Sequence, residues 1–111
     1  MADDDKDGTW DSFHQTVNMT ARELEKWLDT GESQSVGQKK DDEESTGHHS
    51  GRRIVEILRA KRDKLTDDDY AHMRKVVGYA RRHLAQRPRG EIDNSAWRYS
   101  LMNWGHDPTK S

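Results

Sequence analysis

The sequence predicts an all-α fold of three main helices plus a short C-terminal helix, and three observations support this prediction. Apolar residues recur at helical spacing in four segments of the chain. Each segment begins at a Ser or Thr that can cap a helix, and most end at Gly or Pro. The length of 111 residues is enough for one domain.

Composition narrows the class of protein. Hydrophobic residues make up 30% and charged residues 36%, so we expect part of the chain to stay unpacked, although four Trp argue against complete disorder. The absence of cysteine excludes a disulfide framework and a thiolate metal site. No apolar run approaches the roughly 18 residues of a membrane span. These features predict a soluble cytoplasmic protein with no membrane partner.

The acidic start of the chain, residues 1–8, is predicted to be a disordered tail, and residues 9–111 are predicted to form a single helical domain. Residues 9–17 favour a short helix, because three large apolar residues recur there at i, i+3 and i+7.

The next predicted helix begins at Thr20, which forms a capping box with Glu23, and ends at Gly31. Residues 32–50 follow and contain one large apolar residue, Val36, among Ser, Gly and charged residues. They are predicted to be a long flexible loop. The buried stripe of the helix is Leu24, Trp27 and Leu28.

Ser50 is predicted to cap the following helix, which contains possible i,i+4 ion pairs at Arg52–Glu56 and Arg59–Asp63. A tight connection at Leu65–Thr66 would fold this helix against the next one as a helical hairpin. The junction is shorter than the turn of a DNA-binding helix-turn-helix and has no Gly, so that motif matches poorly. The core stripe of the helix is Ile54, Ile57, Leu58 and Leu65.

The longest predicted helix runs from Thr66 to Arg87. Thr66 is suited to be its N-cap with Asp69 as the partner in a capping box, and residues 67–69 place negative charge at the positive end of the helix dipole. Pro88 ends the helix. Its narrow apolar stripe is Tyr70, Met73, Val77, Ala80 and Leu84.

The opposite face of this helix has small residues seven apart between two cationic edges. The small residues are Ala71, Gly78 and Ala85, and the edges are Arg74 with Arg81 and Lys75 with Arg82. One interpretation is that a phosphate backbone approaches closely along the strip. The other is that a second helix packs there, or that the face is merely solvated.

A last short helix is predicted to begin at the cap Ser95 and to end near Gly105. Its apolar stripe favours a core role over a stacking platform for unpaired bases. The stripe residues are Trp97, Leu101 and Trp104, and the side chains expected to be exposed are Arg98, Tyr99 and Met102.

The sequence contains no pattern typical of an active site. It has no Gly-rich phosphate loop, no nucleophile elbow and no HExxH motif. His48 and His49 are adjacent, without a second spaced pair of ligands, and the acidic run 67–69 lacks the spacing of a calcium loop. We therefore predict no enzyme activity, no metal and no other cofactor.

Charge is divided unevenly along the chain, although the net charge is only −2. Residues 1–51 contain 13 acids and 5 bases, whereas residues 52–89 contain 12 bases and 5 acids. Such asymmetry indicates nucleic acid or another polyanion as a partner of the basic part. The acidic part could instead fold back and neutralise it, and the pI of about 6.3 is low for a nucleic-acid binder.

Several segments resemble the DUF3140 family of proteins of unknown function. They are MTARELEKWL, SQSVGQ, SGRRIVEILR, LTDDDYAHMRKVVGYARRHLAQRP and WRYSLMNWGHDP. The resemblance runs from about Met19 to Lys110, and residues 39–46 depart from the Gly- and Glu-rich loop expected in relatives. Members are small microbial and fungal proteins, some labelled DNA-binding, without defined site residues. The resemblance implies a shared fold and favours DNA, and it supplies no catalytic residue.

The leading hypothesis is a DNA-binding protein that uses phosphate contacts more than base readout, which would place it at the nucleoid or in the nucleus. The alternative is a helical protein-interaction module, with a second copy of the chain as one candidate partner. The predicted DNA-binding residues are Arg52, Arg53, Lys61, Arg62, Arg74, Lys75, Arg81, Arg82, Arg87 and Arg89.

Overall fold

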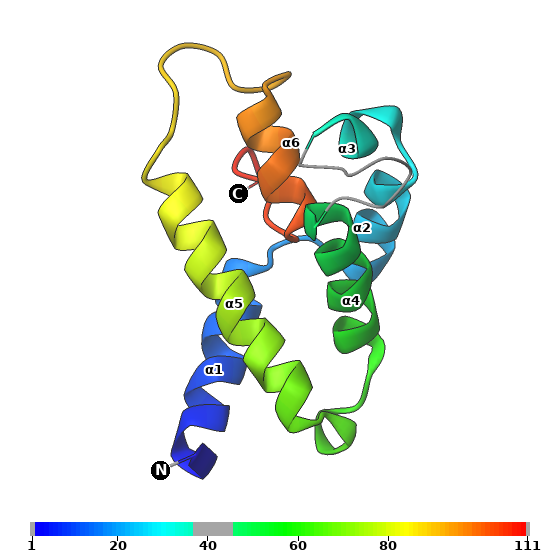
Figure 1. The fold of residues 1–111 in the computed structure, drawn as a ribbon, viewed down its shortest axis with the longest axis vertical. Helices are drawn as coiled ribbons and strands as arrows, with labels where there is room; N and C mark the ends of the chain where they lie inside the picture. The colour runs from blue at the N-terminus through cyan, green and yellow to red at the C-terminus, as the bar shows by residue number, and fades with distance from the viewer. Residues whose placement is uncertain (1, 37–45, 111) are drawn as a thin grey trace.

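The computed structural model describes residues 2–36 and 46–110, and these two stretches contain helices and no strands (Figure 1). The all-α prediction is confirmed. No described helix is long and apolar enough to cross a membrane. The helices are α1 (Ala2–Thr16), α2 (Ala21–Leu28), α3 (Gly31–Ser35), α4 (Thr46–Arg59), α5 (Asp67–Leu84) and α6 (Ala96–Asn103), with a short 3-10 helix at Arg62–Lys64.

Two pairs of helices form most of the fold. α1 packs along α5, and α2 packs along α4. α6 lies between the two pairs, where it contacts α2, α3, α4 and α5. Burial of apolar side chains from α1, α2, α4, α5 and α6 is the main source of stability. Fully buried apolar residues come from five helices and include Phe13, Leu24, Ile54, Met73 and Leu101.

Three helices begin where the sequence signals predict. Thr20 and Thr66 each accept a hydrogen bond from the backbone N–H three residues further on, and Glu23 and Asp69 complete the two capping boxes. Ser95 caps α6 in the same way, without the reciprocal acid. These bonds satisfy N–H groups that a helix leaves unpaired at its start, and each cap contributes about 1 kcal/mol.

α1 is longer than predicted, because residues 2–8 are helical instead of forming a disordered tail. Its first half is held by ion pairs to distant segments. Lys6 Nζ lies 2.9 Å from a carboxylate oxygen of Asp67, and a carboxylate oxygen of Asp7 lies 2.5 Å from Nη2 of Arg62. Disorder was predicted from the acidic composition of this segment alone. Composition gives no information about ion-pair partners that are distant in sequence and that only the fold brings close.

Part of the predicted loop at 32–50 is also helical. Thr30 caps the short α3, so Gly31 begins a helix instead of ending one. Ser33 of α3 is fully buried, which ties this segment to the core. Residues 37–45, the centre of the predicted loop, lie outside the described residues.

α4 begins at Thr46, five residues before the predicted first helical residue Gly51, so Ser50 is not its N-cap. Ser50 is instead buried inside the helix, where its hydroxyl lies 2.8 Å from Nε2 of His72 in α5. Gly51 lies next to it at a close approach between α4 and the rest of the core. A Cβ added there would lie 2.6 Å from the Asn103 carbonyl oxygen and 2.7 Å from Cδ2 of Leu28.

α4 and α5 do not form the predicted helical hairpin. The 3-10 helix separates them, and they diverge so that each packs mainly on a helix from earlier in the chain (Figure 1). The predicted Arg59–Asp63 pair is also wrong, because α4 ends at Arg59 and an i,i+4 pair needs a continuous helix. Arg59 pairs with Glu25 of α2, with Nη1 2.7 Å from the carboxylate.

A buried amide joins α6 to α2 and α3. Asn103 is 1% exposed, and its Oδ1 accepts hydrogen bonds from Trp27 Nε1 at 2.8 Å and from the Ser33 hydroxyl at 2.5 Å. Its Nδ2 donates to the Ser33 carbonyl at 3.1 Å. The polar side chain is therefore compensated by three hydrogen bonds, as burial of an amide requires.

The segment after α6 closes the fold against the segment after α1. Asn18 and Asp107 exchange two hydrogen bonds, of 3.0 Å and 2.8 Å, between side chain and backbone. The Met19 N–H donates to the Gly105 carbonyl at 3.3 Å. Gly105 has φ of 83°, and a Cβ there would lie 3.0 Å from Val17, so this position requires glycine.

Candidate nucleic-acid interface

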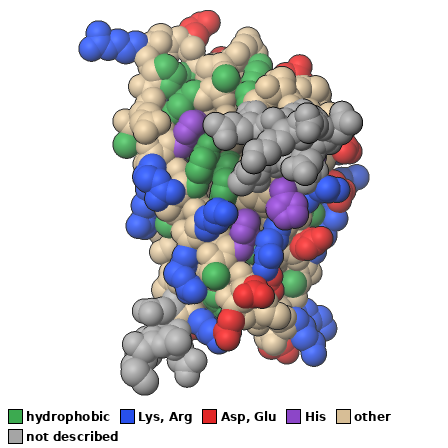
Figure 2. All heavy atoms as spheres, in the orientation of Figure 1, with side chains coloured by type: hydrophobic (Ala, Val, Ile, Leu, Met, Phe, Trp, Pro, Cys, Tyr) green, Lys and Arg blue, Asp and Glu red, His purple; other side chains and the backbone are tan. Residues whose placement is uncertain are grey.

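The solvent-facing side of α5 carries four cations. Arg74, Lys75, Arg81 and Arg82 are all exposed, and no acidic residue occurs between positions 71 and 85. In Figure 2, basic side chains lie in separate groups across the middle of the face shown, with histidine and acidic side chains among them. The small residues between the two cationic edges are Ala71 and Ala85, which are exposed, and Gly78, which is half-buried.

These four cations differ in their ion pairing from four of the eight other arginines. Within residues 2–36 and 46–110, none of the four forms an ion pair. Unpaired exposed cations keep their field directed at solvent, where it can attract a polyanion. The paired arginines are Arg53 with Asp69, Arg59 with Glu25, Arg62 with Asp7 and Arg98 with Asp107.

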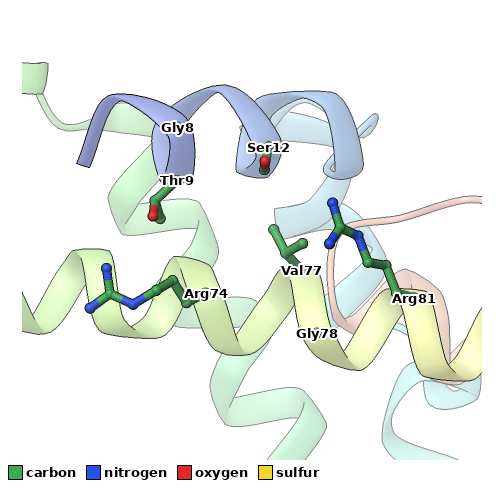
Figure 3. Close-up of a pocket in the computed structure, with 7 residues that line it drawn as sticks. All are labelled: Gly8, Thr9, Ser12, Arg74, Val77, Gly78 and Arg81. Carbon is green, nitrogen blue, oxygen red and sulfur yellow. The ribbon is translucent and has the colours of Figure 1, made fainter. Parts of the chain in front are cut away.

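A groove of about 470 Å³ lies between α1 and α5 beside this face (Figure 3). Arg74 and Arg81 line the α5 wall, and Thr9 and Ser12 extend from α1 on the opposite wall. Two guanidinium groups and two hydroxyls therefore border the same recess, and all four can donate hydrogen bonds. The remaining lining residues are Gly8, Val77 and Gly78.

Gly78 leaves space at the centre of the exposed face, and the side chain of Arg82 extends over it. A Cβ on Gly78 would lie 3.2 Å from Nη1 of Arg82. The predicted strip of small residues is therefore partly covered by a flexible cation. On its other flank, the edge formed by Arg74 and Arg81 lies against the groove shared with α1.

The two predicted residues on α4 lie apart from this groove. Arg52 and Arg53 border a small pocket of about 260 Å³ together with His49 and Glu56. Arg53 also pairs with Asp69, with Nη2 3.2 Å from the carboxylate. This pocket is therefore less basic than the two arginines alone would make it.

His72 lies on the α5 side of the same region. Burial, together with the positive charges of Arg53 and Lys75, lowers the pKa of His72 to about 4. The imidazole is therefore neutral at pH 7. Its hydrogen bond to Ser50 and its stacking on Trp104 give it a structural role between α4, α5 and α6.

The other predicted residues are spread over the surface. Lys61 is exposed before the 3-10 helix, whereas Arg62 is paired with Asp7 and lies 4.4 Å from the centre of the Trp10 ring. Arg87 and Arg89 are exposed in the segment after α5, with the Arg87 guanidinium 5.8 Å from the Trp97 ring centre. The ten predicted residues therefore do not form one patch, and only the four on α5 share one helix face.

Sequence reasoning missed the α1 wall of the groove. The predicted helix at 9–17 places Thr9 and Ser12 away from its apolar stripe, which is a local signal that both could be accessible. It contains no signal that α5 is the helix on which α1 packs. That information comes only from the tertiary structure.

Aromatic rings of α5 and α6 stack on one another. The ring centre of Trp104 lies 4.2 Å from that of Tyr79, Tyr79 lies 5.2 Å from His83, and His83 lies 5.8 Å from Trp97. The planes in each pair are within 15° of parallel. Because these rings cover one another, the stacking favours the core interpretation of the α6 tryptophans over a platform for unpaired bases.

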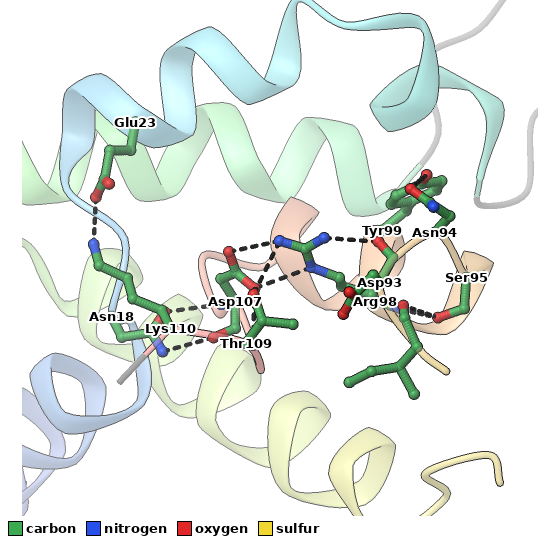
Figure 4. Close-up of polar contacts among 11 residues, drawn as sticks. Asn18, Glu23, Asp93, Asn94, Ser95, Arg98, Tyr99, Asp107, Thr109 and Lys110 are labelled. Carbon is green, nitrogen blue, oxygen red and sulfur yellow. Dashed lines mark hydrogen bonds and ion pairs between the residues drawn. The ribbon is translucent and has the colours of Figure 1, made fainter. Parts of the chain in front are cut away.

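Arg98 is not the exposed cation that the sequence predicts. It is half-buried, and both its Nε and Nη2 donate to Asp107 at 3.1 Å (Figure 4). Burial alone would raise the pKa of Asp107, but hydrogen bonds from Arg98 and Thr109 lower it below its usual value. Tyr99 is also half-buried, with its ring 5.4 Å from Trp27, and Met102 packs against the core.

In the part of the chain that the structure describes, no three His, Cys, Asp or Glu side chains are placed to hold a metal ion. The fold is that of a small all-α protein in which α5 carries four exposed cations. The chain belongs to the family described as protein of unknown function (DUF3140), whose model matches residues 12–102. Comparison with curated proteins and with solved structures found no match.

Proposed function

We propose that this protein binds DNA through the exposed face of α5, mainly by contacts to phosphates. The observation that carries the proposal is the set of four exposed cations on one helix face, without ion pairs in the described stretches of the chain. Contacts between cationic side chains and phosphates dominate the affinity of proteins for DNA, because each neutralised phosphate releases condensed counterions.

The spacing of these cations supports a phosphate-backbone mode of binding. Arg74 and Arg81 are seven residues apart, as are Lys75 and Arg82, so each pair spans about 10 Å along the helix axis. One strand of B-DNA carries a phosphate about every 3.4 Å along its axis, so one pair reaches across about three phosphates. Contacts of this kind position a protein on DNA without reading its sequence.

The remaining predicted residues have a secondary role in this proposal. Arg53 and Arg62 are held in ion pairs, which reduces the charge that they offer to a ligand. The others add to the positive potential around α5 and steer association. They are Arg52, Lys61, Arg87 and Arg89.

A titration of a fluorescein-labelled DNA duplex, followed by anisotropy at several salt concentrations, tests the proposal. The slope of log affinity against log salt should be near −0.9 per neutralised phosphate, or about −3.6 if all four α5 cations bind. Affinity should then fall about 50-fold between about 50 and 150 mM NaCl. Arg81→Glu/Arg82→Glu should remove most of this binding.

Arg22→Glu/Lys26→Glu is a matched control, because it changes the net charge equally at two exposed positions of α2. This control should bind DNA nearly as well as the wild type. The proposal is wrong if the α5 variant binds like the wild type, or if the α2 variant loses just as much affinity.

The alternative is that the strip on α5 binds a helix of another protein or of a second copy. Arg82 lies over Gly78, so close helix packing there would require this side chain to move. That observation favours a polyanion, which Arg82 can contact without leaving its place. Sedimentation of the protein alone separates the homodimer from a monomer that binds DNA.

A further inference from the structure

We propose that the groove between α1 and α5 binds phosphate, with Thr9 and Arg74 as donors at one end and Ser12 and Arg81 as donors at the other (Figure 3). This inference rests on the proposed function and assigns a defined binding site within it. It differs from a general charge effect because two of the four ligands are neutral hydroxyls on a different helix.

The two walls of the groove offer complementary donors. In Figure 3 the side chains of Thr9 and Ser12 extend from α1 toward α5, and the guanidinium of Arg81 reaches toward α1. The guanidinium of Arg74 lies below Thr9, along α5. A phosphate accepts hydrogen bonds at several oxygens, and arginine can donate two parallel bonds to it, whereas Ser and Thr donate one each.

Space and the character of the floor also suit a phosphate. Gly8 and Gly78 contribute no side chain to the lining, and the volume of about 470 Å³ leaves room for a phosphate together with several waters. Val77 is 7% exposed at the floor of the groove, so part of the lining is apolar. A charge-assisted hydrogen bond is stronger beside such a surface than in open water.

The charge balance of the groove favours an anion. Its seven lining residues include two arginines and no acid. Asp7 of α1 pairs with Arg62, and Asp67 at the start of α5 pairs with Lys6 and also interacts electrostatically with Arg74. Asp11, beside Ser12 in α1, is exposed and lies outside the lining of the groove. The ligand is therefore a phosphate group, either at the end of a nucleic-acid strand or within its backbone.

The test is an NMR titration of the ¹⁵N-labelled full chain with three probes. They are inorganic phosphate, a short single-stranded oligonucleotide with a 5′-phosphate, and the same oligonucleotide without it. Saturable shifts of the Thr9, Ser12 and Gly78 amides are expected with inorganic phosphate. A stronger effect of the 5′-phosphorylated strand identifies a terminal phosphate as ligand, and equal effects of both strands identify the backbone.

Thr9→Val/Ser12→Ala removes both hydroxyls without changing the charge, and both positions are half-buried on a helix, so the fold should be retained. We expect this variant to bind inorganic phosphate at least fivefold more weakly. Arg22→Ala, which removes an exposed cation from α2, should leave phosphate binding unchanged.

The inference is overturned if groove amides do not shift, or if the hydroxyl-deleted variant binds phosphate like the wild type. The outcome is separable from that of the proposed function. If Thr9→Val/Ser12→Ala binds phosphate and DNA like the wild type, with the same salt dependence, the phosphate site in the groove is wrong and the proposal for the α5 surface stands. If the groove binds phosphate but the protein does not bind DNA, the phosphate site stands and the proposed DNA-binding function is wrong.

Discussion

The same substitution, Gly to Ala, should have opposite effects on stability at two positions inside helices. Gly51 in α4 is buried, and Gly78 in α5 is half-buried on the exposed face. Neither has a positive φ, so backbone strain does not distinguish them. What distinguishes them is the atom that an added Cβ would meet.

At Gly51 the new Cβ would lie 2.6 Å from a backbone oxygen of Asn103 and 2.7 Å from a methyl of Leu28. Neither α4 nor α6 can yield without moving core side chains, and overpacking costs about 1–3 kcal/mol. Ala is favoured over Gly in a helix by about 0.5–1 kcal/mol, which offsets part of this. The net loss for Gly51→Ala should be about 1–2 kcal/mol.

At Gly78 the nearest atom is Nη1 of Arg82, at 3.2 Å. This is the end of a flexible, exposed side chain that can move at little cost. The helix preference then dominates, so Gly78→Ala should stabilise the protein by about 0.5–1 kcal/mol.

Urea denaturation followed by far-UV circular dichroism measures both effects. With a slope of about 1–3 kcal/mol per molar urea, the two variants should have midpoints about 1 M apart, on either side of the wild type. A destabilised Gly78→Ala would show that Arg82 is held rigidly. A neutral Gly51→Ala would refute the close approach of α4 to α6 and α2.

Two further changes probe the core. Asn103→Ala should lower the free energy of unfolding by about 2–4 kcal/mol, because buried groups of Trp27 and Ser33 lose their partner; a loss below about 1 kcal/mol in urea would contradict this. Burial and the charges of Arg53 and Lys75 lower the pKa of His72 from 6.5 to about 4 in the folded protein. Between pH 6.5 and pH 4 the unfolded chain therefore binds a proton that the folded protein does not. The free energy of unfolding of the wild type should fall as the pH drops through this range. In His72→Gln, the urea midpoint should change less with pH between 6.5 and 4 than in the wild type. The same change of midpoint with pH in both proteins would refute this role of His72.

The parts of the fold that were predictable from sequence are those governed by local interactions. The caps Thr20, Thr66 and Ser95 act on backbone groups within three residues, so their pattern can be read directly from the chain. α3 was missed although Thr30 caps it, because its polar sequence has no apolar stripe and its stability comes from the contact of Ser33 with Asn103.

The candidate site shows the same division. Helical periodicity alone places Arg74, Lys75, Arg81 and Arg82 on one face of α5. Which arginines form ion pairs could not be predicted, because Arg62 finds its acid on α1, 55 residues away in sequence. The hydroxyl wall of the groove was not predictable for the same reason.

The contacts between the segment after α1 and the segment after α6 bear on which residues a fragment must contain in order to fold. The family match stops at residue 102, yet the groups that close the structure, on Asn103, Gly105 and Asp107, all follow it. Thr9, on the wall of the groove, precedes residue 12, where the match begins. A fragment cut at the family boundaries would lack both the closing contacts of the core and half of the hydroxyl wall. The family-model match is therefore shorter than the set of residues that pack together in this structure.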